Sequence, residues 1–156
     1  MQQALPDSPR RRAYLALVSA SDALVDQFKK LFQSHGLTLT QFNLLRLLLT
    51  GPKAGETCGA LRDQMLHRVP DITRLVDRME REGLVERHRA KHDRRVVLIN
   101  ITAEGQRRCE QVYPELVKIH DAQFPGLSAD ELLELERLLR LAENAAKGPG
   151  RPPLTA

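Results

Sequence analysis

The sequence predicts a mainly α-helical fold that carries one small β-hairpin. Apolar residues recur at three- and four-residue spacing through most of the chain, which is typical of helices with one buried face. One alternating apolar run, residues 96–101, instead suits a strand, because β-branched side chains pack well on a pleated surface. Gly and Pro separate these segments, and the chain has no internal repeat.

Length and composition indicate one globular domain. A chain of 156 residues is long enough to bury a real core, and its formal net charge is +4. Two cysteines make no disulfide framework, and no apolar run approaches the roughly 20 residues of a membrane span. We expect a cytoplasmic protein with a domain at 9–146, a disordered start at 1–8 and a disordered Gly- and Pro-rich tail at 147–156.

The first predicted helix covers about 9–32 and ends before Gly36. The three arginines at 10–12 precede its apolar face, and they are equally consistent with phosphate contacts and with simple solvation. Thr38 and Gln41 have the spacing of a capping box, which predicts a helix over 39–50.

Two short helices follow. Thr57 is a plausible N-cap for a helix over 58–66, and residues 67–69 form the turn. Pro70 is expected to open the next helix, with Asp71 in its first turn and its end before Gly83. The apolar residues of this helix share one stripe, which predicts that they are buried: Ile72, Leu75, Val76 and Met79.

The β-hairpin is expected to start at Leu84 and to return along residues 96–101. Its tip is strongly basic, with one acid, Asp93, among the cations Arg87, Arg89, Lys91, Arg94 and Arg95. Thr102 then caps a helix that runs to about 122, residues 124–126 break the chain, and Ser128 opens a last helix over 129–146 through a second capping box.

A short exposed helix followed by a basic hairpin tip is an arrangement that reads double-stranded DNA. The helix fits the major groove, and an Arg from the tip suits the negative potential of a narrow minor groove. The helix residues expected to face the major groove are Asp71, Thr73, Arg74, Asp77 and Arg78. Arg74 and Arg78 are the candidates for guanine, because the guanidinium fork matches its O6 and N7 acceptors. Thr73 suits a phosphate or a thymine methyl group.

Each residue of the hairpin tip has an expected role. Arg94 is the first candidate for the minor groove and Arg95 the second, and Asp93 is expected to orient one of these arginines through a charge-assisted bond. The remaining cations are either phosphate contacts or solvated: Arg87, Arg89 and Lys91.

This stretch resembles the signature of the MarR family of winged helix-turn-helix transcription regulators. The resemblance rests on residues 73–79, on 83–85 with Arg87, on 93–95, and on 101–102 with Gly105, and it covers about 38–105. It implies a winged helix-turn-helix over about 38–102 and dimerisation helices at about 9–35 and 103–146. It further implies a homodimeric repressor that binds an inverted-repeat operator and is released by a small molecule, such as an aromatic or phenolic compound.

The family places that ligand between the dimerisation helices and the DNA-reading lobe. Residues of this chain that would line the pocket, each of which is also consistent with ordinary core, are Phe28, Phe32, His35, Phe42, Leu45 and Tyr113. The apolar character of the last helix independently favours a dimer. Residues 132–141 are apolar on more than one face, which implies a second partner surface.

Other kinds of function have weaker support. His88, His92 and Asp93 lie on a basic tip without the convergent spacing of a metal site, so no metal or cofactor is expected. No phosphate loop or nucleophile motif indicates an enzyme, and no catalytic residue is assigned. Two alternatives remain: a redox-responsive regulator that uses Cys58 at a predicted helix N-terminus, and a winged helix that binds protein without specific DNA binding.

Overall fold

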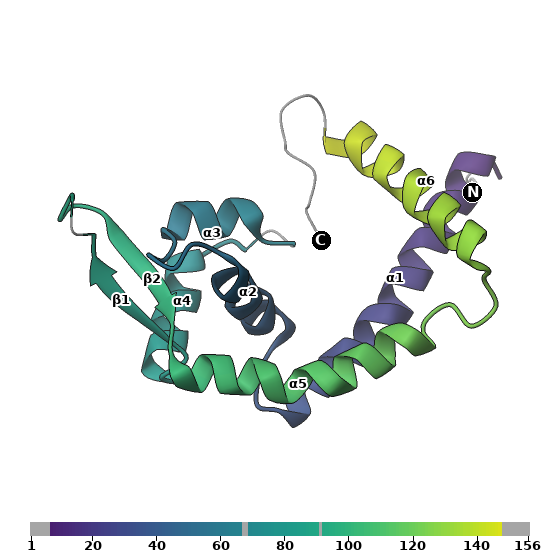
Figure 1. The fold of residues 1–156 in the computed structure, drawn as a ribbon. Coiled ribbons are helices and arrows are strands. Elements are labelled where there is room, and N and C mark those ends of the chain that lie inside the picture. The colour runs from purple at the N-terminus through teal and green to yellow at the C-terminus, as the bar shows by residue number, and fades with distance from the viewer. Residues whose placement is uncertain (1–6, 67–68, 91, 148–156) are drawn as a thin grey trace, which may run out of the picture.

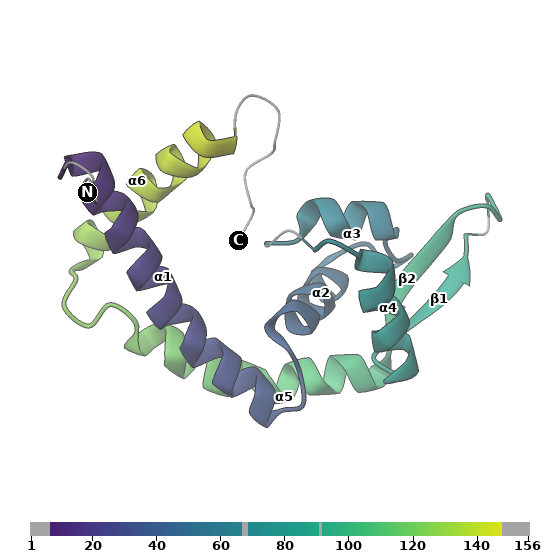
Figure 2. The same ribbon diagram turned by 180° about the vertical axis from the view of Figure 1, so that it is seen from behind.

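The computed structural model describes residues 7–66, 69–90 and 92–147, and it confirms the mainly helical fold with one antiparallel hairpin. Helices α2 (Leu39–Thr50), α3 (Cys58–Gln64) and α4 (Ile72–Arg81) gather beside the hairpin of β1 (Val85–Arg89) and β2 (Val97–Ile101). Helix α5 (Ala103–Ala122) runs from this lobe to the far end of the molecule, where α1 (Pro9–Ser34) and α6 (Ala129–Lys147) lie (Figures 1 and 2). No helix in the described ranges has the length and apolar character to cross a membrane.

Hydroxyl side chains fix where most helices begin. Before α2, α3, α5 and α6, a side-chain oxygen accepts a hydrogen bond from the third backbone N–H of the helix, as the sequence predicted: Thr38, Thr57, Thr102 and Ser128. Ser8 caps α1 in the same way. The expected disorder at the two termini stays a prediction, because residues 1–6 and 148–156 lie outside the described ranges.

The start of α4 differs from the prediction. The helix begins at Ile72 rather than Pro70, because the Asp71 carboxylate accepts the Arg74 backbone N–H over 3.0 Å and thereby makes Asp71 the N-cap. The helix ends before Gly83, whose φ of 71° is the left-handed conformation expected there. Helix α3 is also shorter than predicted, since it ends at Gln64 rather than 66.

The core lies inside the lobe of α2, α3, α4 and the hairpin, and α5 closes it. Three residues of the predicted α4 stripe, Ile72, Val76 and Met79, are buried, and Leu75 packs against them half-buried. They meet fully buried side chains from the other elements: Leu44, Leu45, Leu61, Leu84, Ile99 and Val112. This core holds α4 at a fixed angle to the hairpin.

The hairpin pairs Val85 with Ile101 and Arg89 with Val97, and an isolated β-bridge that the sequence did not predict joins it to the loop before α3. Glu56 and Ile99 exchange two backbone hydrogen bonds, of 3.0 and 2.8 Å. Gly55 permits this approach, because it has a φ of 93° and a Cβ there would lie 1.8 Å from Asn100 Oδ1. The middle of β2 is therefore joined to the loop before α3, and the β1–β2 hairpin is called the wing from here on.

Helix α5 is fixed through its N-cap residue to the junction between α4 and β1. The Thr102 hydroxyl donates to the Gly83 carbonyl over 2.6 Å, and the Thr102 backbone N–H donates to Leu84 over 3.1 Å. Gly105 follows on the same face, where a Cβ would lie only 2.2 Å from the Leu84 carbonyl oxygen. The helix thus starts in close contact with the DNA-reading lobe.

Helices α1 and α6 leave much of their apolar surface open. Tyr14 is 64% exposed and Leu133 is 65% exposed, although both are large apolar residues. Other exposed apolar side chains continue this surface: Leu15, Leu17, Val18, Leu132, Leu138, Leu139 and Leu141. A patch of this size on a single chain is typical of a protein interaction surface.

Candidate nucleic-acid interface and ligand cavity

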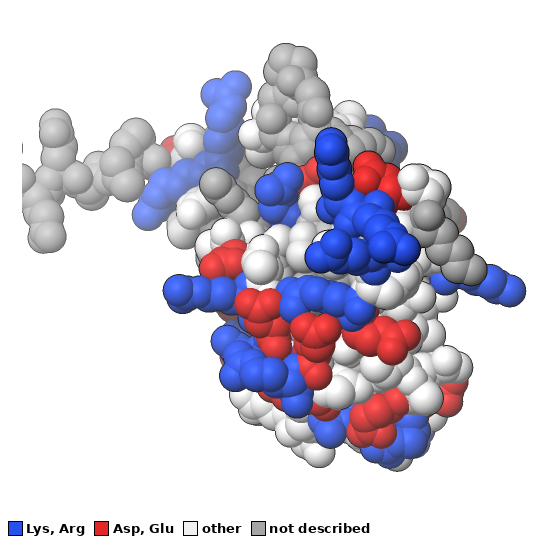
Figure 3. All heavy atoms as spheres, turned by 90° about the vertical axis from the view of Figure 1, so that its left-hand side faces the viewer, with Lys and Arg blue, Asp and Glu red and all other residues white. Residues whose placement is uncertain are grey.

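The outer face of α4 presents two arginines to solvent. The Arg74 side chain is 86% exposed, and its Nε lies 3.2 Å from Asp71 Oδ2, so the N-cap carboxylate also orients this guanidinium. Arg78 is exposed and has no ion pair with another residue in the described ranges. Figure 3 shows the end of the molecule that carries the hairpin, where Lys and Arg side chains stand out among acidic ones.

Arg87 joins the hairpin to α4, which the sequence did not predict. Its guanidinium forms ion pairs of 2.6 Å with Asp77 Oδ1 and of 2.6 Å with Glu80 Oε2, and only 24% of the side chain is exposed. Its Nη2 also donates to the Thr73 carbonyl over 3.5 Å. Although burial opposes it, hydrogen bonding to the two carboxylates raises the pKa of Arg87. Arg87 and Asp77 therefore fix the position of the wing against α4. Asp77 was expected to face the major groove, and Arg87 to contact phosphate or to be solvated.

The turn at the hairpin tip is organised by Asp93. Its carboxylate accepts the Arg95 backbone N–H over 2.9 Å, and its carbonyl accepts the Val96 N–H over 3.0 Å. Asp93 was expected to orient an arginine side chain, but among described residues it holds Arg95 by the backbone amide instead. Side chains that this turn leaves exposed, without an ion pair to a described residue, are Arg89, Arg94 and Arg95. Lys91 lies outside the described residues.

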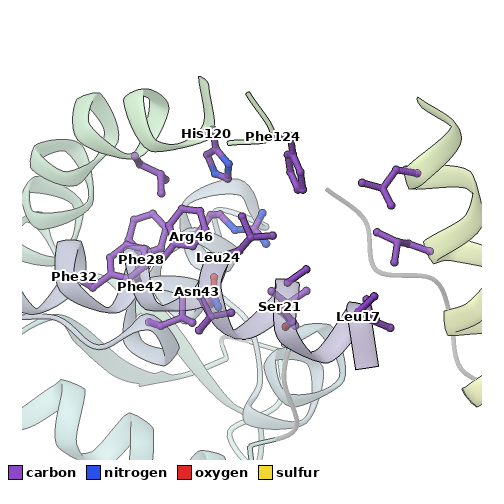
Figure 4. Close-up of a pocket in the computed structure, with 18 of the residues that line it drawn as sticks. Leu17, Ser21, Leu24, Phe28, Phe32, Phe42, Asn43, Arg46, His120 and Phe124 are labelled. Atoms are coloured by element: carbon purple, nitrogen blue, oxygen red, sulfur yellow. The ribbon is translucent and has the colours of Figure 1, made fainter. Parts of the chain in front are cut away.

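A cavity of about 790 Å³ lies between α1, α2, α5 and α6 (Figure 4). Three of the predicted lining residues contribute to it: Phe28, Phe32 and Phe42. Their rings form a stacked series, with centroids 6.4 Å apart for Phe28 and Phe32 and 4.5 Å apart for Phe32 and Phe42. The cavity therefore has an aromatic wall at the end where α1 meets α2.

The other three predicted lining residues do not face the cavity. Leu45 is fully buried in the core, because the cavity face of α2 is formed by residues three and four apart, 39, 42, 43 and 46, and Leu45 falls outside that face. His35 is held by Glu115, with 3.1 Å between Nε2 and Oε1. Tyr113 packs edge-on against Phe42 at 6.1 Å.

The cavity also contains polar residues that the sequence reasoning missed. Asn43 and Arg46 lie on the cavity face of α2, and His120 of α5 lies 5.1 Å from the Phe28 ring. Asn43 is only 8% exposed, yet its buried Nδ2 has no hydrogen-bond partner among the described residues. A signal was present in the sequence, since Asn43 and Arg46 are polar residues at three-residue spacing in an otherwise apolar stretch of helix.

The two cysteines occupy different environments. Cys109 is fully buried in α5, and burial, together with the charge of Glu110, raises its pKa to about 11. Its thiol is therefore protonated near neutral pH and a poor nucleophile. Cys58 is the first residue of α3 and is half-buried. Within the described ranges, no group of three or more His, Cys, Asp or Glu residues is arranged to hold a metal ion.

Comparison with known proteins identifies the fold of this arrangement. The computed structure superimposes on the crystal structure of a MarR transcription factor from Planctomyces limnophilus with a TM-score of 0.66 and 35% sequence identity, covering 88% of this chain and 99% of that one. It also matches the fold of Sco3205, a MarR family regulator from Streptomyces coelicolor in complex with DNA, with a TM-score of 0.81, 18% identity and coverage of 96% and 95%.

Sequence comparison gives the same assignment. The MarR family model matches residues 35–96. The homoprotocatechuate degradative operon repressor of Escherichia coli is 32% identical over 128 residues, which cover 80% of this chain and 83% of the repressor. The transcriptional regulator FarR of Neisseria gonorrhoeae is 29% identical over 125 residues, with coverage of 80% and 84%. The chain therefore belongs to the MarR family of winged-helix, DNA-binding transcription regulators.

Proposed function

We propose that this protein is a homodimeric repressor that binds an inverted-repeat operator and is released by an aromatic or phenolic small molecule. The observation that carries the proposal is the joining of α4 to the hairpin by Arg87, with ion pairs of 2.6 Å to Asp77 and to Glu80. This connection holds an arginine-bearing helix and a basic tip as one rigid unit. A rigid unit of this kind can enter a major groove and the adjacent minor groove together.

The proposed DNA contacts follow from which side chains are exposed. Arg74 and Arg78 read guanine in the major groove, and Thr73 contacts a phosphate or a thymine methyl group. Arg94, with Arg95 as the second candidate, enters the minor groove. Phosphates are contacted by Arg89 and, outside the described residues, by Lys91. Residues that position these groups rather than read bases are Asp71, Asp77, Arg87 and Asp93.

A dimer is supported by the apolar surface of α1 and α6. Side chains such as Tyr14, Leu133 and Leu138 are between 49% and 65% exposed, and a second copy of the chain would cover them. A two-fold dimer presents two copies of α4, so its operator consists of two inverted half-sites. Helices in successive major grooves lie about 34 Å apart, or about 10 base pairs centre to centre.

Release by a ligand is supported by the cavity and by one relative. The cavity has an aromatic wall formed by Phe28, Phe32 and Phe42, which suits a flat aromatic ring. The Escherichia coli relative, at 32% identity, is a repressor of an operon for degrading homoprotocatechuate, an aromatic compound. The relatives are transcription regulators, and we propose no catalytic activity for this chain.

Selection of binding sites from randomised duplex DNA tests this proposal. The selected sequences are expected to contain two inverted half-sites. Inserting five base pairs between them turns the half-sites to opposite faces of the duplex and is expected to abolish tight binding, whereas inserting a full turn of about ten restores part of it. Selected sequences without a dyad, or affinity that is unchanged by the five-pair insertion, would show that the paired-helix arrangement is wrong.

A further inference from the structure

The two arginines on the outer face of α4 have different surroundings. Arg74 and Arg78 lie four residues apart, so they are neighbours on one face of the helix. The Nε of Arg74 lies 3.2 Å from Oδ2 of Asp71, whereas Arg78 has no ion pair with another described residue. The helix therefore presents to solvent one arginine that has a carboxylate beside it and one arginine that has none.

Asp71 contacts Arg74 through both of its carboxylate oxygens. Oδ1 accepts the Arg74 backbone N–H over 3.0 Å, as the N-cap of α4, and Oδ2 pairs with Nε. The first contact fixes the carboxylate relative to the helix, whose next residue, Ile72, is buried in the core. The second contact is made at Nε, so the two Nη groups beyond it can meet the O6 and N7 acceptors of a guanine. Asp71 thus orients Arg74 from a fixed position.

The other acidic side chains within α4 are bound to the wing. Asp77 and Glu80 share the guanidinium of Arg87, each at 2.6 Å. Asp71 lies at the opposite end of the helix, where 50% of its side chain is exposed. It is therefore placed to act on DNA binding through the arginine beside it, while the other two acids position the wing.

The Asp71 carboxylate changes what Arg74 gains from DNA. An unpaired guanidinium gains affinity from any phosphate, and a phosphate contact carries no base information. The pair of Asp71 and Arg74 has no net charge, so a phosphate attracts it less than it would attract Arg74 alone. In water an exposed pair of this kind is weak. It strengthens when the helix enters a groove and displaces water, because the local dielectric constant falls.

We propose that Asp71 is a specificity-determining residue, which holds Arg74 toward a guanine and opposes the use of that arginine as a phosphate contact. Asp71 positions Arg74 and does not bind a base itself. This inference rests on the proposed function, in which α4 enters the major groove. It follows that a protein without this negative charge binds DNA more tightly but less selectively.

Asp71→Asn tests this role without removing the helix cap, because Asn caps a helix about as well as Asp. Fluorescence anisotropy of the full-length protein measures affinity for the selected operator, for operators changed at each base pair, and for a random duplex. The variant is expected to bind the random duplex about fivefold or more tightly at about 0.1 M salt, with a slope of log K against log salt that is steeper by about 0.9 per subunit. Its preference at the base pair that Arg74 reads is expected to fall by about fivefold or more.

Two further variants separate this role from a structural one. Asp71→Ala removes the cap as well as the charge, so it is expected to lower the melting temperature, whereas Asp71→Asn should melt close to the wild type. Asp26→Asn is the matched control, because it removes the partner of Lys29 at the same three-residue spacing, from α1 rather than α4. It raises the net charge by the same amount and is expected to leave base preference unchanged.

A double variant identifies the route by which Asp71 acts. If Asp71 acts through Arg74, Asp71→Asn has no effect on base preference when Arg74→Ala is already present. The inference is overturned if the effect persists there, because Asp71 would then read a base directly, or if Asp71→Asn alone leaves base preference and random-duplex affinity unchanged. Failure of the proposed function gives a different result. In that case Arg74→Ala leaves every base preference as it is in the wild type, α4 does not read bases, and the inference falls with it.

Discussion

The Gln41 side chain in α2 donates a hydrogen bond from Nε2 to Glu82 Oε2, over 2.6 Å, at the C-terminal end of α4. Gln41 is only 4% exposed, and its Oε1 accepts the backbone N–H of Thr38 over 2.9 Å in the capping box of α2. Helix α2 also carries Phe42, Asn43 and Arg46 on its cavity face. One buried side chain therefore connects the helix that lines the cavity to the helix proposed to read DNA.

We expect Gln41→Ala to lower the free energy of unfolding by about 1–3 kcal/mol. The change removes the buried member of the capping box and leaves the Glu82 carboxylate without its donor. Urea unfolding measures the effect. Gln106→Ala is the matched control, because the exposed Gln106 side chain bonds Glu110 alone among the described residues. Its loss should lower the free energy of unfolding by no more than about 0.5 kcal/mol. If the two variants lost the same free energy of unfolding, the hydrogen bond between Gln41 and Glu82 would not contribute to stability as proposed.

Arg87→Met is expected to destabilise the protein by about 1–3 kcal/mol while leaving the salt dependence of DNA binding unchanged. The substitution keeps most of the side-chain volume but leaves Asp77 and Glu80 without their shared cation. A phosphate contact would behave differently, since each one lost changes the slope of log K against log salt by about 0.9. Titrations at several salt concentrations, with unfolding measured alongside, distinguish positioning of the wing from direct contact.

Arg78→Ala and Arg94→Ala are expected to weaken DNA binding in different ways. Arg78 is proposed to read a base, so its loss should cost about 1–3 kcal/mol at the selected operator and relax the preference at one symmetric pair of positions. Arg94 is proposed to enter the minor groove, so its loss should matter most where A·T pairs narrow that groove. Competition between selected and altered duplexes measures both. If each variant lost the same affinity on every DNA sequence, both residues would be phosphate contacts that read no base.

Leu138→Asp is expected to dissociate the proposed dimer. Leu138 is 49% exposed in the chain, so a charge there costs little in a monomer but would be buried by a second copy. Sedimentation at micromolar concentration measures the assembly, and circular dichroism checks that the variant keeps its helices. Glu136→Gln changes a neighbouring exposed residue of α6 without adding charge and serves as the control. A wild-type chain that sediments as a monomer would refute the dimer directly.

Glu104 should make stability depend on pH in acid. Hydrogen bonds from Arg107 and Arg108, at 2.7 and 2.9 Å, hold the pKa of this carboxyl at about 2, below its ordinary 4.5. Between these values the unfolded chain binds more protons than the folded one, so the stability that Glu104 contributes is present above pH 4.5 and is lost as the pH falls toward 2.

The variant Glu104→Gln isolates this contribution. Urea unfolding at about pH 6, 4.5 and 3 should show a smaller loss of stability for Glu104→Gln than for the wild type, because the variant has no carboxyl to protonate there. Glu86→Gln, at an exposed position of β1, is the matched control and should follow the wild type. If the difference in unfolding free energy between the wild type and Glu104→Gln were the same at all three pH values, protonation of Glu104 would not be the cause of the loss of stability in acid.

The elements of the fold were predictable where their signals are local. Thr38, Thr57, Thr102 and Ser128 cap the helices that they were predicted to cap, because each bond spans only three residues. At the start of α4 two local rules conflicted. Pro70 suits a first helical position, but the Asp71 carboxylate satisfies a backbone N–H, and that bond sets the helix start.

The sites were less predictable, because their contacts join distant segments. Arg87 was identified as a cation at the hairpin tip, but its ion pairs with Asp77 and Glu80 depend on how the wing packs on α4. Leu45 was assigned to the pocket that the family resemblance implies, and the rotation of α2 places Asn43 and Arg46 there instead. Helical spacing identifies a shared face, but only the packing of the other helices determines which face borders the cavity.

Helix α5 has a mechanical consequence that follows from its two attachments. Thr102 fixes its first turn to the junction of α4 and the wing, while Leu116 and His120 near its other end line the cavity. A helix of 20 residues is about 30 Å long. Pivoting such a rod by about 3° at one end displaces the other by about 1.5 Å, which exceeds the tolerance of a hydrogen bond. In the repressor proposed above, a ligand that rotates this end of α5 slightly would therefore move the DNA-reading surface at the other end.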